Sequence, residues 1–181
     1  MQVSEERQAP MKMTTITSND SEILIPGFSL PSTRGGVRMG PADFRQQKNL
    51  ILFFFDSWKC QQCRRILRSL KEHAGTYREL DSAILGVVQV SLIGLTKAAA
   101  ELEPDVTLLA DEDGRVTAAY QGDGAGIILP FLVVADRYGA FYGRLEFASG
   151  EDLDHRELAS LLEFIETQCP ECGVPRGDEA M

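Results

Sequence analysis

Residues 49–70 read NLILFFFDSWKCQQCRRILRSL. The first half contains an unbroken apolar run over residues 50–55, which predicts a central strand buried on both faces. In the second half, apolar side chains recur at steps of three and four residues, which predicts an amphipathic helix. The predicted apolar face of this helix comprises Cys63, Ile66, Leu67, Leu70, Ala74 and Tyr77. Cys60 and Cys63 therefore lie at a junction between a strand and a helix.

The spacing of these two cysteines predicts a dithiol redox site. If Cys60 lies in the first helical turn, Cys63 lies on the same face, so a disulfide can close with little backbone movement. The helix N-terminus and Lys59 favour a thiolate at Cys60, which is the predicted nucleophile. Cys63 lies on the apolar stripe and is the predicted resolving thiol. Half of a zinc site and a pair of incidental thiols are the alternatives for such a motif.

The chain has 181 residues, enough for one domain with a substantial core. Its net charge of -9 argues against nucleic acid and against an anionic membrane as partners, because both would be repelled. No apolar run has the length of a signal-peptide core or a membrane span, so we expect a cytoplasmic protein. In that compartment a vicinal cysteine pair is more often catalytic or metal-binding than structural.

Three segments are predicted along the chain. Residues 1–22 are polar and lack periodicity, which indicates a flexible or loosely docked arm. Residues 23–168 form the domain, and residues 169–181 form a polar tail that contains CPEC. The domain is expected to begin with a hairpin that turns at Gly35 and Gly36, followed by a short helix with Pro41 in its first turn. After the cysteine helix, strands are predicted at 84–90, 106–110, 129–136 and 141–147, and helices at 95–103, 115–120 and 155–167.

This order of elements is that of the thioredoxin fold, an α/β fold with a central mixed β-sheet covered by helices on both faces. Here the fold carries an N-terminal β-hairpin extension. The motifs PGFSL, ILFFF, CQQC, LLADEDG and LPFLVVADRYG resemble the redoxin group, which includes the alkyl hydroperoxide reductase and thiol-specific antioxidant proteins and the thioredoxin-like reductases. The resemblance covers residues 25–165. It implies an antioxidant redox enzyme without a cofactor, which acts on a protein disulfide or thiol and is served by a thioredoxin-type reductant.

Three positions bear on which chemistry of the redoxin group applies. Peroxiredoxins carry a proline and a threonine seven and three residues before the reactive cysteine, and an arginine on a later strand. Phe53, Ser57 and Pro130 occupy these places in this chain. In the reductases the position of the peroxiredoxin arginine holds a cis-proline that packs against the cysteine pair. Pro130 occupies this position and is therefore a candidate cis-proline.

The main hypothesis is therefore thiol–disulfide exchange. Cys60 would attack a partner disulfide, and Cys63 would release the product by closing the Cys60–Cys63 bond. Trp58, Lys59 and Pro130 are predicted to border the substrate groove. The alternatives are a peroxiredoxin-type thiol peroxidase that reduces hydroperoxides, and a redox-inactive or zinc-binding module. The reductases place tryptophan directly before the first cysteine, whereas Lys59 intervenes here, and the residues between the cysteines, Gln61 and Gln62, include no proline. Because the residues between the cysteines tune the reduction potential, the direction of electron flow stays open.

The tail contains a second pair, Cys169 and Cys172, in the sequence CPECG. This turn has the form of one zinc-ribbon knuckle, although zinc usually takes four ligands. A zinc site, a redox relay to the main pair and a plain surface pair are the alternatives, and the same turn of a second subunit in a homodimer is one source of further ligands. His73 and His155 lie among charged residues of predicted helices, so we expect both to be solvated rather than functional.

Overall fold

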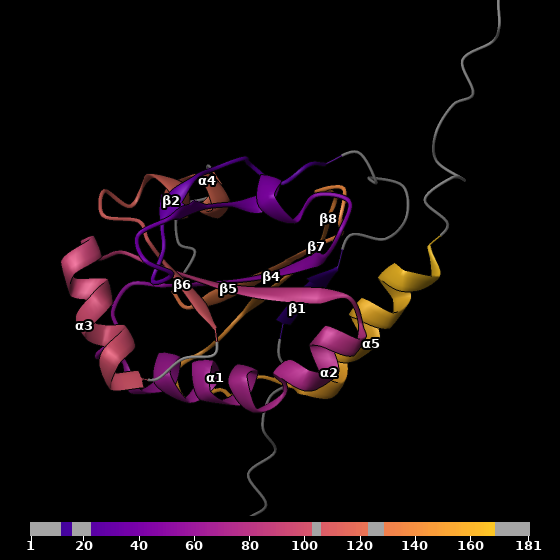
Figure 1. Cartoon of the computed structure of the whole chain (residues 1–181). Helices are drawn as coiled ribbons and strands as arrows, with labels where there is room; N and C mark the ends of the chain where they lie inside the picture. The colour runs from indigo at the N-terminus through magenta and orange to yellow at the C-terminus, as the bar shows by residue number, and fades with distance from the viewer. Residues whose placement is uncertain (1–11, 16–22, 103–105, 123–128, 169–181) are drawn as a thin grey trace, which may run out of the picture.

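The computed structural model describes residues 12–15, 23–102, 106–122 and 129–168. A six-stranded sheet in the order β1-β8-β7-β4-β5-β6 forms its centre (Figure 1). Strands β4, β5 and β6 run parallel to one another, whereas β7 is antiparallel to both of its neighbours, β4 and β8. The strands of this sheet are β1 (Lys12–Thr15), β4 (Asn49–Phe55), β5 (Ser82–Val88), β6 (Thr107–Ala110), β7 (Phe131–Ala135) and β8 (Phe141–Glu146).

Helices cover both faces of the sheet, which confirms the predicted thioredoxin fold. Helices α1, α2 and α5 lie together below the sheet in Figure 1, and α4 lies above it with the small hairpin. The hairpin pairs β2 (Leu30–Pro31) with β3 (Arg38–Met39), as predicted. The helices are η1 (Pro41–Phe44), α1 (Gln61–Glu72), α2 (Ala74–Glu79), α3 (Leu92–Leu102), α4 (Arg115–Gln121) and α5 (His155–Thr167).

Strand β4 separates two hydrophobic cores. All seven of its residues are buried, as the apolar run predicted. Because side chains alternate across a strand, successive residues serve opposite faces. Ile51, Phe53 and Phe55 pack with residues of α1 and α5, whereas Leu50, Leu52 and Phe54 pack on the other face with Tyr120 of α4 and Phe131 of β7.

Two glycines permit close packing around this sheet. A Cβ on Gly40 would lie 1.9 Å from the Phe28 carbonyl oxygen, so no other residue fits at the start of η1. A Cβ on Gly86 in β5 would lie 2.6 Å from Leu108 of β6. The absence of a side chain at Gly86 therefore lets the core side chains of the parallel strands meet.

The predicted cysteine helix is interrupted, which corrects the continuous helix expected through Tyr77. Helix α1 ends at Glu72, and His73 lies between it and α2 with φ -97° and ψ 5°. Two features of the sequence account for the break. The His73 ring bonds to the Ser69 carbonyl, and Gly75 just beyond the break has low helix propensity.

Strand β1 lies within the segment that was predicted as an arm. Residues Lys12–Thr15 pair antiparallel with β8, with Lys12 opposite Glu146 and Thr15 opposite Gly143. Four polar or weakly apolar residues without alternation give no strand signal of their own, and the pairing partner is more than a hundred residues away. The other residues of segment 1–22, like the tail 169–181, lie outside the described residues.

Candidate active site

The cysteine pair lies where β4 leads into α1, as predicted. Cys60 is the N-cap residue of α1, with an extended backbone at φ -62° and ψ 116°. Its sulfur accepts a hydrogen bond from the Cys63 backbone N–H at 3.2 Å. Both cysteines are free thiols. The first turn of α1 therefore directs an otherwise unpaired amide at the sulfur atom, an arrangement that stabilises a thiolate.

The two sulfurs differ in exposure. Cys60 is half-buried, whereas Cys63 is fully buried in the core beside α5. Burial raises the pKa of the Cys63 thiol, and the hydrogen bond and negative charge of Cys60 and the charge of Asp56 raise it further. Cys63 therefore keeps its proton, whereas Cys60 is the thiol open to a reactant. The roles of nucleophile and resolving thiol stay predictions.

The loop before Cys60 carries the predicted groove residues Trp58 and Lys59. Trp58 is half-buried and packs against the core that contains Cys63. Lys59 is exposed, and its ammonium lies 5.9 Å from the centre of the Trp58 ring. The Lys59 backbone N–H donates to the Ser57 hydroxyl at 3.2 Å, so Ser57 shapes this loop. Residues 56–59 of this loop contain two charged side chains, Asp56 and Lys59.

Pro130 lies at the same end of the sheet. The Leu129–Pro130 peptide bond is cis, as the resemblance to the reductases implied. Phe131 is opposite Phe54 in the β4–β7 register, which puts Pro130 beside the end of β4 that leads to Cys60. Pro130 is buried, and its carbonyl accepts the Phe147 N–H at 3.4 Å. Its predicted part in a substrate groove stays a prediction.

A tether between α1 and the loop after β8 was not predicted from the sequence. The Gln62 side-chain amide donates to the carbonyls of Ala148 and Glu151, at 2.6 and 3.0 Å. One turn further on, Arg65 pairs with Asp152 at 3.0 Å. The acceptors of Gln62 are backbone atoms more than eighty residues away, so no sequence motif announces them.

The histidines correct the expectation of solvated positions. His73 and His155 are half-buried, and their rings stack with centroids 3.6 Å apart and planes inclined by 8°. Nδ1 of His155 is hydrogen-bonded to the hydroxyl of Tyr77, which is 1% exposed. Burial, and secondarily the charge of His73, lowers the pKa of His155 to about 4. The break between α1 and α2 brings these rings together, and no periodicity indicates such a long-range contact.

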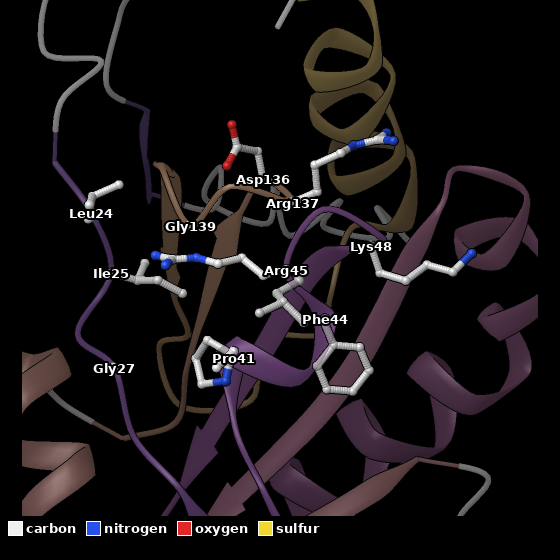
Figure 2. A pocket seen from close by; sticks show the side chains of 12 residues that line it. Leu24, Ile25, Gly27, Pro41, Phe44, Arg45, Lys48, Asp136, Arg137 and Gly139 are labelled. Atoms are coloured by element: carbon white, nitrogen blue, oxygen red, sulfur yellow. The ribbon is translucent and has the colours of Figure 1, made fainter.

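A separate pocket of about 170 Å³ lies at the opposite end of β4 (Figure 2). Leu50, near the start of the strand, lines it, whereas Cys60 follows the far end of the strand. Two of its cations, Lys48 and Arg137, are already paired with Asp81 and Glu166. Because a seven-residue strand is about 20 Å long, the pocket is remote from the cysteine chemistry.

The predicted tail pair, Cys169 and Cys172, lies outside the described residues. Within the part of the chain that the structure describes, no group of three or more His, Cys, Asp or Glu side chains is arranged to hold a metal ion. No helix in that same part is long and apolar enough to cross a bilayer.

The thioredoxin fold and the dithiol at the N-terminus of α1 are the features of a thiol redox protein. Comparison with family models matches residues 24–140 to the AhpC/TSA family. The chain therefore belongs to the AhpC/TSA family and is an antioxidant redox enzyme. A search of curated proteins gave no match.

Solved structures with a similar fold include a peroxidoxin, an AhpC and a peroxiredoxin. Peroxidoxin BcpB from Mycobacterium tuberculosis is 19% identical, with a TM-score of 0.66 over 79% of this chain and 96% of its own. Mycobacterium tuberculosis AhpC is 15% identical, with a TM-score of 0.68 over 83% of this chain and 96% of its own. A yeast mitochondrial 1-Cys peroxiredoxin, whose thiol resolving mechanism is described as proceeding via glutathione/thioredoxin systems, is 12% identical. Its TM-score is 0.70, over 80% of this chain and 75% of its own.

Proposed function

We propose that this protein is a thiol peroxidase that reduces hydroperoxides with the Cys60–Cys63 dithiol. The observation that carries the proposal is the asymmetric pair itself. A half-buried sulfur accepts the Cys63 N–H at the start of α1, and a buried, protonated thiol lies three residues behind it. Membership of the AhpC/TSA family and similarity in fold to peroxiredoxins favour hydroperoxide as the oxidant over a protein disulfide.

The first step oxidises Cys60. Its thiolate attacks one oxygen of the hydroperoxide, so an S–O bond forms as the O–O bond breaks. The leaving alkoxide takes a proton from solvent and departs as an alcohol, or as water from hydrogen peroxide. Two electrons pass from sulfur to the peroxide, which leaves Cys60 as a sulfenic acid.

The second step uses Cys63. Cys63 first loses its proton to solvent, and its thiolate attacks the Cys60 sulfur as the S–O bond breaks. The departing hydroxide takes a proton from solvent and leaves as water. The product is a Cys60–Cys63 disulfide. A dithiol reductant of the thioredoxin type then returns two electrons and two protons by exchange through Cys60, the more accessible sulfur.

The test is hydroperoxide consumption with thioredoxin and its reductase, in a background where Cys169 and Cys172 are serine. Protein that keeps Cys60 and Cys63 in this background should consume many equivalents of hydroperoxide. Cys60→Ser should abolish consumption, because the attacking sulfur is gone. Cys63→Ser should consume about one equivalent and then slow at least about tenfold, because no internal thiol closes the disulfide.

Thiol–disulfide exchange is the second candidate, and the cis peptide before Pro130 is the observation that favours it. The same variants distinguish the two functions when insulin replaces peroxide. Rapid insulin reduction without peroxide turnover would replace the peroxidase proposal by exchange, and Cys63→Ser would then trap a mixed disulfide through Cys60. Peroxide turnover with slow insulin reduction supports the peroxidase.

A redox-inactive or zinc-binding module is the remaining alternative, and the acidity of Cys60 distinguishes it. A midpoint for thiolate formation well below the free-cysteine value of about 8.5 supports an enzyme. An ordinary or raised midpoint, together with no turnover of either substrate, would favour the inactive module. Stoichiometric zinc that disappears in the Cys169→Ser, Cys172→Ser variant would assign metal binding to the tail. A homodimer, in which the same turn of a second subunit supplies further ligands, is tested by measuring the molecular mass in solution.

A further inference from the structure

The N-terminal turn of α1 is fastened to a loop distant in sequence. We call this fastening the Gln62 tether: the Gln62 side-chain amide with the carbonyl oxygens of Ala148 and Glu151, at 2.6 and 3.0 Å. Both amide hydrogens are thus used by acceptors of one loop. Gln62 lies between the two cysteines, so the tether acts on the turn that carries the reactive sulfur.

The loop that receives the tether is itself held closed. The Glu151 carboxylate accepts the Ala148 N–H at 2.7 Å, and the Glu151 N–H donates to the Ala148 carbonyl at 3.1 Å. Gly150 has φ +87°, a conformation that glycine adopts without strain. The two acceptor carbonyls therefore occupy defined positions beside α1. Arg65 adds a hydrogen bond to the Gly150 carbonyl and the pair with Asp152, both exposed and correspondingly weak.

The geometry at Cys60 depends on this same turn. The Cys63 N–H reaches the Cys60 sulfur at 3.2 Å, and the Arg64 N–H donates to the Cys60 carbonyl at 3.1 Å. First turns of helices fray readily, because their first amides lack partners within the helix. Fraying here would move the Cys63 amide away from the sulfur that it stabilises.

We propose that Gln62 is a positioning residue for the reactive cysteine: its tether holds the first turn of α1 in place and keeps the Cys63 N–H directed at the Cys60 sulfur. The inference deepens the proposed function, yet it concerns the thiolate itself and holds for any reaction that begins at Cys60. Its test therefore reads the thiolate rather than turnover.

The chain offers a matched control in the neighbouring glutamine. Gln61 has the same side chain and also lies between the two cysteines, but it is exposed. The carbonyls of the loop accept hydrogen bonds from Gln62. Gln62→Met removes both amide donors and keeps the length of the side chain. Gln61→Met makes the same chemical change without touching the tether.

Two measurements are made on full-length protein in which Cys169 and Cys172 are serine. Thiolate absorbance against pH gives the midpoint of the more acidic thiol, and amide exchange reports opening at Cys63 and Arg64. Gln62→Met should raise the midpoint by about half to one pH unit, the effect of weakening one hydrogen bond to a charged group. Exchange at the two amides should become faster. Gln61→Met should match wild type in both.

The charged groups around this turn are the same in both variants. They are Asp56 and Lys59 before the helix, Arg64 and Arg65 within it, and Glu151 and Asp152 in the loop. A difference between the two methionine variants therefore reports the tether rather than net charge. Gln62→Asn, which is polar but one methylene too short to reach both carbonyls, should shift the midpoint in the same direction and serves if the methionine variant folds poorly.

An unchanged midpoint in folded Gln62→Met or Gln62→Asn would overturn the proposal, as would an equal shift in Gln61→Met. Faster amide exchange without a shift in the midpoint would also overturn it, because the tether would then have no effect on the sulfur. Since neither readout uses peroxide, failure of the peroxidase proposal leaves this test intact, and the converse also holds.

Discussion

The two cysteines of the CQQC motif lie in different surroundings. Cys60 lies at the open start of α1, and Cys63 lies in the core. The sequence predicted this difference correctly, because the three-residue spacing puts Cys63 on the apolar stripe of the helix. It did not predict Gln62 as a neighbour of the loop after β8, because the acceptors there are backbone carbonyls and carry no residue signature.

The resolving step should depend steeply on pH. Burial raises the pKa of Cys63, so only a small fraction of it is thiolate near neutral pH. Below that pKa the thiolate fraction, and hence the rate of disulfide closure, should rise about tenfold per pH unit. Trp58 is the only tryptophan in the chain and lies two residues before Cys60, so stopped-flow fluorescence after a peroxide pulse follows the step. A rate independent of pH between about 6 and 9 would show that Cys63 is already ionised.

His155 should make the free energy of unfolding depend on pH. Its folded-state pKa of about 4 lies below the ordinary histidine value of 6.5, so the unfolded chain takes up the proton first. Stability is therefore fully present above pH 6.5 and decreases as the pH falls towards 4. Because the ring is only half-buried, we expect a loss on the order of 1–2 kcal/mol.

The measurement is chemical denaturation at several pH values for wild type and His155→Gln. The variant should lose less stability between pH 6.5 and 4, since glutamine does not titrate. Parallel pH profiles for the two proteins would show that His155 does not carry the effect.

At the scale of elements, strong local patterns were predicted correctly and long-range pairings were not. The apolar run gave β4, and the three-and-four spacing gave α1. Strand β5 begins two residues before its predicted start, at Ser82, because its first residue pairs with Asn49 of β4. Strand β1 was missed for a similar reason, since its partner β8 stabilises it and its own composition does not.

Helix α5 begins where the sequence predicted it, at residue 155, and the capping bonds to Asp154 can be tested. The Asp154 carboxylate accepts the N–H groups of Arg156 and Glu157 at 2.9 and 3.1 Å. Asp154→Ala should therefore lower the free energy of unfolding by about 1 kcal/mol. Glu163→Ala, on an exposed position of the same helix, should change it by less than about 0.5 kcal/mol. Equal losses in the two variants by urea denaturation would contradict the capping role.

Across the whole molecule, buried polar contacts join segments that the sequence separates. Asn49 is fully buried at the start of β4, and its side chain bonds to Glu166 of α5, the Leu80 carbonyl and the Arg137 N–H. The apolar pattern specified which faces are buried. It could not specify this polar junction, because a single asparagine before an apolar run has no periodicity to interpret.

Replacement of Asn49 should destabilise the entire fold. Asn49→Ala leaves the Arg137 N–H and the Glu166 carboxylate without this partner, so we expect a loss of about 2–3 kcal/mol. Lys48→Met next to it removes an exposed pair with Asp81 and should cost much less, because water and salt screen such a pair. Urea denaturation should give unchanged slopes with shifted midpoints. A loss at Asn49 no larger than that at Lys48 would show that the junction is not needed.

The central claim concerns both sulfurs, and the mass of the protein after one equivalent of hydroperoxide tests it most directly. With Cys169 and Cys172 replaced by serine, the wild-type pair should lose two hydrogen atoms as the Cys60–Cys63 disulfide forms. Cys63→Ser should instead gain one oxygen at Cys60, trapped by a sulfenic-acid reagent, and Cys60→Ser should remain unchanged. Oxygen gain that survives Cys60→Ser, or a wild-type pair left reduced by peroxide, would contradict the account.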